Sequence, residues 1–199
     1  MAIEYRMASG DRPPLEIHRS TRRRRTASAA ARDGTLVIRL PAAMPDDEAE
    51  ATIARLVRRV LGAGRAAARG GDDHLRARAE RLADRYVDGV RPTAVTWSSR
   101  MSRQHGSCSS ADGTIRISSA LASAPDAVLD HVIIHELAHL RHPDHGADFA
   151  RLVARHEHAD WARGWLAGHA AGMLGASAWH DAGTRGPAVD ADTADHPAP

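Results

Sequence analysis

Residues 124–149 have the sequence APDAVLDHVIIHELAHLRHPDHGADF. The first half is rich in apolar side chains, and Pro125 fits the first turn of a helix, where its missing N–H does no harm. Pro143 cannot continue a helix, because its ring clashes with the preceding turn. The stretch therefore predicts an apolar helix that begins near Pro125 and reaches about His142, then a turn, and another helix from about Gly146.

Two histidines of this expected helix are spaced for a shared metal ion. His135 and His139 are four residues apart, so their rings lie on one helix face. Neutral imidazole nitrogen is a preferred zinc ligand. Glu136 follows the first histidine and can reach a water on the metal, which is the general-base position of the HExxH pattern. We therefore expect one Zn²⁺ per chain and metal-assisted hydrolysis of a peptide bond, with Glu136 as general base.

A catalytic zinc needs a third protein ligand and an open position. His145 follows the expected turn and gives the spacing HExxHxxxxxH. His142 shares roughly the face of His139 but lies further up the same helix. Glu157 comes later, on the following helix. The residues favour His145 and leave the other two open.

Other polar groups are candidates for supporting roles. An oxyanion stabiliser should exist, and the sequence does not choose among the three candidates, Tyr86, His105 and His142. Carboxylates commonly orient ligating imidazoles. The acids close to the motif are Asp130, Asp144 and Asp148.

Three further metal-binding side chains are expected to have no part in the site. His156 and His158 are two residues apart, so they face different ways on a helix, and we expect both at the surface. Cys108 is the single cysteine of the 199 residues. Because three histidines already suffice for zinc, we expect Cys108 to be an inert small hydrophobic residue.

The composition indicates where in the cell the protein acts and whether it contacts a membrane. One cysteine cannot form an intrachain disulfide, which argues against a secreted protein. The first residues contain no apolar run typical of a signal peptide, and no stretch approaches the ~18 apolar residues of a membrane span. We therefore expect a soluble, cytoplasmic protein with no membrane partner.

Charge is uneven along the chain. The formal net charge is +2, yet residues 1–45 contain nine arginines and four acids, with a run at Arg22–Arg25. Electrostatics would permit contact with nucleic acid there. The interpretation we favour is an arginine-rich strand face in solvent.

The amino-terminal part shows a strand pattern. Leu15 and Ile17 alternate with polar residues, Asp33-Gly34 is a hairpin turn signal, and the alternation resumes over 36–40. We expect an antiparallel β-meander. Helical spacing then begins at Asp46, with a flexible connection over 62–73 and a second helix to about Asp88.

A strand is also expected at 114–118, after the turn signal Asp112-Gly113. An extended peptide substrate would pair with this strand if its edge were free. The alternative is an ordinary core strand.

The segment RMSRQHGSCSSADGTIRIS, residues 100–118, together with 124–149, resembles the YgjP-like metallopeptidase domain. That family is related to the SprT-like and WLM proteases of the zincin class. Its recurring features are a Gly-Ser-Cys segment, a strand, an HELxHL helix, and an Asn/Asp-His pair before a phenylalanine. They correspond here to residues 106–108, 115–118 and 135–140, and to Asp144-His145 with Phe149.

The resemblance covers about residues 15–170. It implies zinc ligands at His135, His139 and His145, a catalytic Glu136 and a peptide or protein substrate, and it decides for His145 as third ligand. Two positions depart from the family pattern, which commonly has Trp in place of His105 and Asn near Ser118. Both lie outside the expected metal shell, so they concern substrate handling.

The expected fold is α+β, with an amino-terminal antiparallel β-meander and a helical carboxy-terminal half around a zincin-like core. The expected parts are an amino-terminal tail at 1–14, the meander and a helix at 15–72, the catalytic core at 73–176 and a disordered tail at 177–199.

Two rival functions remain. The first is a nucleic-acid-associated protease, because the SprT-like and WLM relatives act on proteins attached to DNA; the Arg22–Arg25 run is its local support. The second is a non-catalytic, zinc-stabilised module, which predicts that Glu136→Gln leaves function intact.

Overall fold

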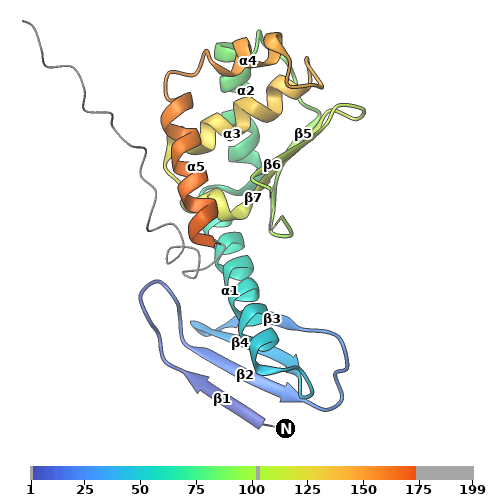
Figure 1. Ribbon diagram of the computed structural model, residues 1–199, viewed down its shortest axis with the longest axis vertical. Coiled ribbons are helices and arrows are strands. Elements are labelled where there is room, and N and C mark those ends of the chain that lie inside the picture. Colours follow the sequence, from blue (N-terminus) through green and yellow to red (C-terminus); the bar gives the residue numbers. More distant parts are fainter. Residues whose placement is uncertain (1, 102–103, 174–199) are drawn as a thin grey trace, which may run out of the picture.

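The computed structural model describes residues 2–101 and 104–173, with side chains up to 169. The expected α+β class is confirmed: the described residues form helices and two small sheets (Figure 1). The helices are α1 Asp46–Ala68, α2 Gly71–Tyr86, α3 Asp126–His139, α4 Ala147–Val153 and α5 Ala159–Met173, with a short 3₁₀ helix, η1, at Ser119–Ser123. The strands are β1 Ala2–Arg6, β2 Leu15–Ser20, β3 Ser28–Arg32, β4 Thr35–Pro41, β5 Ala94–Ser98, β6 Gly106–Ser109 and β7 Thr114–Ser118.

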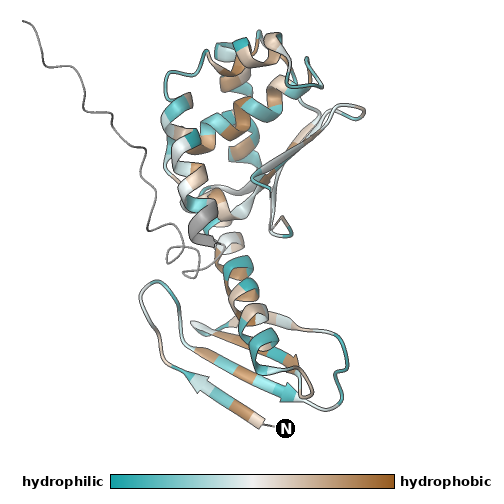
Figure 2. Ribbon diagram, in the orientation of Figure 1, coloured by the Kyte–Doolittle hydropathy of each residue, from teal (hydrophilic) through white to brown (hydrophobic). Residues whose placement is uncertain are grey.

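The amino-terminal sheet is mixed, so the prediction of an antiparallel meander is wrong. Its order is β1-β2-β4-β3, and β4 runs parallel to β2 while forming a hairpin with β3 at Asp33-Gly34. The register places Leu36 beside Leu15 and Ile38 beside Ile17. The parallel pairing of β2 with β4 brings these apolar side chains together in one buried stripe under α1, which explains why it forms. The alternation along β2 is visible in Figure 2.

Residues 2–6, which we expected within a tail, form the edge strand β1. The strand pairs antiparallel with β2 over its whole length. Ile3 and Tyr5 are exposed on it, so backbone hydrogen bonds hold this strand more than apolar burial does. That is why its apolar pattern did not distinguish it from a tail.

Helix α1 is longer than predicted and connects the two halves of the fold. The flexible connection expected over 62–73 is wrong, because the helix continues to Ala68 and α2 begins at Gly71. The first half of α1 covers the amino-terminal sheet with side chains such as Ile53. At Gly62 the helix crosses η1 so closely that a Cβ would lie 3.0 Å from the carbonyl oxygen of Ser119. The division into domains near residue 72 stays a prediction.

The second sheet has the order β5-β7-β6. The turn predicted at Asp112-Gly113 is confirmed, and it joins the antiparallel strands β6 and β7, with Gly113 at φ +71°. Strand β7 is paired on both sides, so it is a core strand and cannot add a peptide strand. In this sheet β6 is the edge strand beside α3.

Helix α3 is the centre of the second half. The sheet, α2, α4 and α5 surround it (Figure 1), and most of its side chains are buried. Only one strip of the helix borders a cleft, which is why two histidines of this helix are half-buried rather than exposed.

The carboxy-terminal half is helical as expected, with two differences. The chain between α4 and α5, residues 154–158, is not helical, although we expected Glu157 on a helix. The disordered tail predicted at 177–199 lies outside the described residues. Among those described, no helix combines the length and apolar character that a membrane crossing needs.

Candidate metal centre

Three imidazoles converge at the carboxy-terminal end of α3. The ligating nitrogens of His135, His139 and His145 all lie within 4.8 Å of one another. The Nε2 atoms of His135 and His145 are 3.3 Å apart. Two nitrogens bound to one tetrahedral zinc at 2.0–2.1 Å are separated by about 3.3–3.4 Å. The donor set and this spacing therefore fit a zinc ion.

The orientation of His139 suits a ligand. Its Nδ1 lies 3.2 Å from the carbonyl oxygen of His142. Because a carbonyl only accepts hydrogen bonds, the proton is on Nδ1 and the lone pair of Nε2 is free. The turn at Leu140–Pro143, which follows α3, thus fixes one histidine and brings His145 back toward the other two.

Phe149 of α4 packs against all three histidines. Its ring centroid lies 4.9 Å from that of His135, 4.5 Å from that of His139 and 4.7 Å from that of His145. The side chain is buried. A single aromatic ring therefore restricts the motion of each candidate ligand, a packing role that the sequence motif did not reveal.

Glu136 is buried between α3 and the edge strand β6. Its side chain is 6% exposed, and burial raises its pKa to about 7. Gly106 is the reason the strand approaches so closely: a Cβ there would lie 2.5 Å from Oε1 of Glu136. The glycine of the Gly-Ser-Cys segment therefore leaves room for the carboxylate.

The pKa values of the two histidines on α3, His135 and His139, are lowered. Burial, with the neighbouring His139 and His145, lowers the pKa of His135 to about 4. Burial also lowers the pKa of His139. Neutral imidazole is the form that binds metal, so these ligands are ready to bind without first losing a proton.

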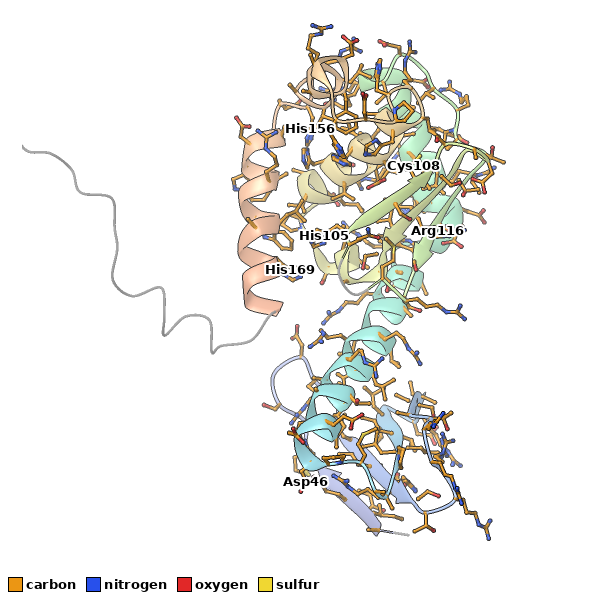
Figure 3. All side chains as sticks on the ribbon, turned by 45° about the vertical axis from the view of Figure 1, so that its right-hand side comes forward. Asp46, His105, Cys108, Arg116, His156 and His169 are labelled. Carbon is orange, nitrogen blue, oxygen red and sulfur yellow. The ribbon has the colours of Figure 1, made fainter. Side chains whose placement is uncertain are left out.

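The three histidines and Glu136 open into a cleft of about 370 Å³. Gly106, Ser107 and Cys108 of β6 line its opposite wall. A second cavity of about 370 Å³ adjoins it across Gly106 and Glu136 and includes His105 and His131. Figure 3 shows His105 and Cys108 beside this part of the sheet, far from Asp46 at the start of α1.

A family model for the YgjP-like metallopeptidase domain matches residues 65–167, just over half of the chain. The chain belongs to this family. The resemblance seen in the sequence is thereby confirmed, and the protein is a metallopeptidase by family.

Among solved structures, the YgjP-like chain is similar to the crystal structure of the metallopeptidase zymogen of Pyrococcus abyssi abylysin. The sequence identity is 24%, the TM-score is 0.42, and the likeness covers 46% of this chain and 90% of that chain. No curated protein matches the chain.

Several other predicted residues of the YgjP-like domain have side-chain partners outside this centre. Glu157 accepts a hydrogen bond of 2.8 Å from the hydroxyl of Tyr86, which removes Tyr86 from the candidates for oxyanion stabiliser. Asp130 pairs with Arg78 at 2.5 Å and Asp148 with Arg151. Among the described contacts, no carboxylate bonds to a candidate histidine ligand; the carbonyl of His142 is the partner of His139.

Cys108 borders the cleft as a thiol. Burial, followed by the charge of Glu136, raises its pKa to about 11. It is half-buried and is not among the converging ligand atoms. A neutral thiol is a poor zinc ligand, so Cys108 belongs to the cleft wall and not to the candidate ligands.

His156 is buried, so its predicted surface position is wrong. Its ring stacks on that of His131 with centroids 5.9 Å apart. The Nδ1 atoms of both rings are buried without a hydrogen-bond partner in the described part of the chain. Burial lowers the pKa of His131 to about 4 and also lowers that of His156. Both are therefore neutral in the folded YgjP-like domain.

This pair predicts that the metal-free protein loses stability in mild acid. Between the ordinary pKa of 6.5 and the folded value of about 4, the unfolded chain binds a proton at His131 that the folded chain does not. Stability is thus complete above that window and falls as the pH falls through it. The expected loss from His131 is about 3 kcal/mol over the whole window. Urea unfolding of the chelated protein at several pH values measures it.

The variant His131→Leu serves as the control, because it removes one titrating group and leaves those of the metal centre. Its free energy of unfolding should depend less steeply on pH than that of the wild type by about one proton. Equal slopes in the two proteins would contradict the assignment.

Proposed function

We propose that this YgjP-like protein is a zinc-dependent metallopeptidase, with one Zn²⁺ held by His135, His139 and His145 and with Glu136 as general base. The observation that carries the proposal is the convergence of three imidazoles beside a buried carboxylate in one cleft. This donor set leaves a coordination position open, as catalytic zinc sites require.

Bound zinc would lower the pKa of a water ligand and polarise the scissile carbonyl. Glu136 takes a proton from the attacking water while the water oxygen bonds to the carbonyl carbon. The same carboxyl group then gives that proton to the amine nitrogen as the C–N bond breaks. A pKa raised to about 7 by burial suits a group that must accept and release a proton near neutral pH.

The substrate is a peptide or protein in extended form. Strand β6 has a free edge beside the cleft, and its backbone groups can pair with such a chain. His105 and His142 remain candidate oxyanion stabilisers, and we favour His105 because it lines the adjoining cavity with Glu136. Burial lowers its pKa, so it would donate a hydrogen bond as a neutral imidazole.

The proposal is tested by removing the metal with a chelator and then adding zinc back. Protein purified without chelator should contain one zinc per chain by elemental analysis and cleave peptides from an unbiased library. Chelation should abolish cleavage, and one equivalent of zinc should restore it. Cleavage by protein shown to be free of metal would contradict the proposal.

One alternative function is a non-catalytic, zinc-stabilised module. It predicts a protein that contains zinc but cleaves no peptide, and the same assay would detect this result. The Arg22–Arg25 run lies in the segment that joins β2 and β3, in the amino-terminal sheet and away from the cleft. No observation at that run favours a nucleic-acid-associated protease. A cytoplasmic location is part of the proposal, as expected from the single cysteine.

A further inference from the structure

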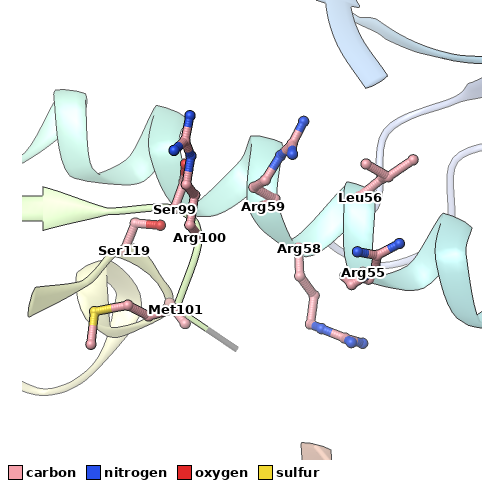
Figure 4. A pocket seen from close by; sticks show the side chains of 9 residues that line it. Arg55, Leu56, Arg58, Arg59, Ser99, Arg100, Met101 and Ser119 are labelled. Carbon is pink, nitrogen blue, oxygen red and sulfur yellow. The ribbon is translucent and has the colours of Figure 1, made fainter. Parts of the chain in front are cut away.

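A third cavity lies at the waist of the molecule, where α1 meets η1 and the end of β5. It has a volume of about 310 Å³ and shares no lining residue with the metal cleft. Arginines and two serines make up much of its wall (Figure 4), and apolar residues complete it. The polar residues are Arg55, Arg58, Arg59, Arg100, Ser99 and Ser119, and the apolar ones are Leu56, Met101 and Ala120.

The part of α1 that lines this cavity contributes positive charge and no negative charge. Residues 51–71 contain five arginines and no acid. Arg65 pairs with Asp11 and Arg69 with Asp126.

The four arginines of the cavity are all exposed. Within residues 2–101 and 104–173, none of them forms an ion pair. Unpaired guanidinium groups held around a concave surface attract an anionic ligand.

The directions of the side chains distinguish a small anion from a chain of anions. Arg55 and Arg59 are one helical turn apart, about 6 Å along the axis of α1. Figure 4 shows Arg59 and Arg100 pointing to one side of the helix and Arg58 to the other. The guanidinium groups therefore do not converge on one phosphate, and together they suit several phosphates of an extended strand.

We propose that this arginine waist (Arg55, Arg58, Arg59 and Arg100) binds the phosphate backbone of a nucleic-acid strand. Guanidinium and hydroxyl groups are the donors that proteins use on phosphate oxygens. Among the described residues, the cavity wall has no aromatic ring on which a base would stack, so we expect binding that does not depend on base sequence. The inference is independent of the peptidase activity, because it concerns a separate surface and a separate measurement.

Fluorescence anisotropy of a labelled oligonucleotide of about 20 nucleotides, single-stranded and as a duplex, tests it. At ~50 mM salt the full-length protein should bind at least one form, and for the single strand log K should fall with log salt with a slope of about −3, from four phosphate contacts. Replacing Arg55, Arg58 and Arg59 by Gln should weaken binding at least about tenfold and reduce the slope to about −1. Circular dichroism checks that each variant is folded.

Arg22, Arg24 and Arg25 provide the matched control, since replacing them by Gln removes the same charge from the β2–β3 segment. Binding should change less than about threefold there. Lys at the three α1 positions keeps the charge and should retain most of the binding, which separates the charge from any change in the helix.

Several outcomes would overturn the inference. Equal losses in the two Gln variants would assign binding to net charge alone. Loss in the control variant alone would place the site at the β2–β3 segment. Displacement of the oligonucleotide by pyrophosphate at equal concentration would show a small-anion pocket, and equal displacement by polyglutamate would show an acidic-protein surface. No binding to either oligonucleotide would also reject it.

Discussion

The variant Glu136→Gln is expected to reduce kcat/KM for peptide hydrolysis by about 10³-fold or more, with the zinc content unchanged. Glutamine has the size of glutamate but cannot accept the proton of the attacking water. Because Glu136 is not among the converging ligand atoms, the metal should remain. Hydrolysis of a cleavable peptide and elemental analysis of the same samples measure the two quantities.

The matched control is Glu157→Gln. That glutamate bonds with Tyr86 and lies outside the cleft wall, so activity should stay within about threefold of the wild type. If Glu136→Gln also kept activity within that range, the general base would be another group. If neither the wild type nor Glu136→Gln cleaved any peptide while both contained zinc, the non-catalytic module would be favoured.

The variant His145→Ala is expected to weaken zinc binding by at least about 100-fold. His145 is exposed, so its truncation should leave the fold intact. Its imidazole completes the triangle with the two histidines of α3, and two ligands alone hold zinc poorly. Competition with a chromogenic chelator measures the affinity.

His142→Ala and Glu157→Ala test the alternative third ligands. Both should retain one zinc. In His142→Ala the backbone carbonyl that orients His139 is still present. Loss of zinc in Glu157→Ala, with retention in His145→Ala, would move the third ligand to Glu157.

The candidate metal centre was accessible from sequence because its parts are local. His135, Glu136 and His139 lie on one helix, whose period fixes their relative directions. His145 is six residues further, beyond a turn that Pro143 enforces. In contrast, the contact of Gly106 with Glu136 joins positions 30 residues apart, which no local period reports.

Two of the wrong predictions, the antiparallel meander and the surface position of His156, share a physical cause, namely contact between segments that are distant in the sequence. A parallel β2–β4 pair and a hairpin meander need the same alternation in each strand, so the pattern cannot distinguish them. His156 has the spacing of a surface residue, yet the ring of His131 and that of Tyr86 pack against it. Burial of a polar ring depends on its tertiary neighbours, which are absent from a local pattern.

Helix α1 also constrains how the gene can change. The family match begins at residue 65, inside this helix and beyond Gly62. One face of α1 covers the amino-terminal sheet, and a later turn of the same helix contacts η1. The direction of the first contact relative to the second is therefore set by the number of residues between them. Inserting one residue between them would rotate the sheet by about 100° relative to η1, whereas seven residues, about two turns, would nearly restore the phase. Recombination that joins the YgjP-like part to another amino-terminal sheet must therefore preserve the length of α1 in near-whole turns.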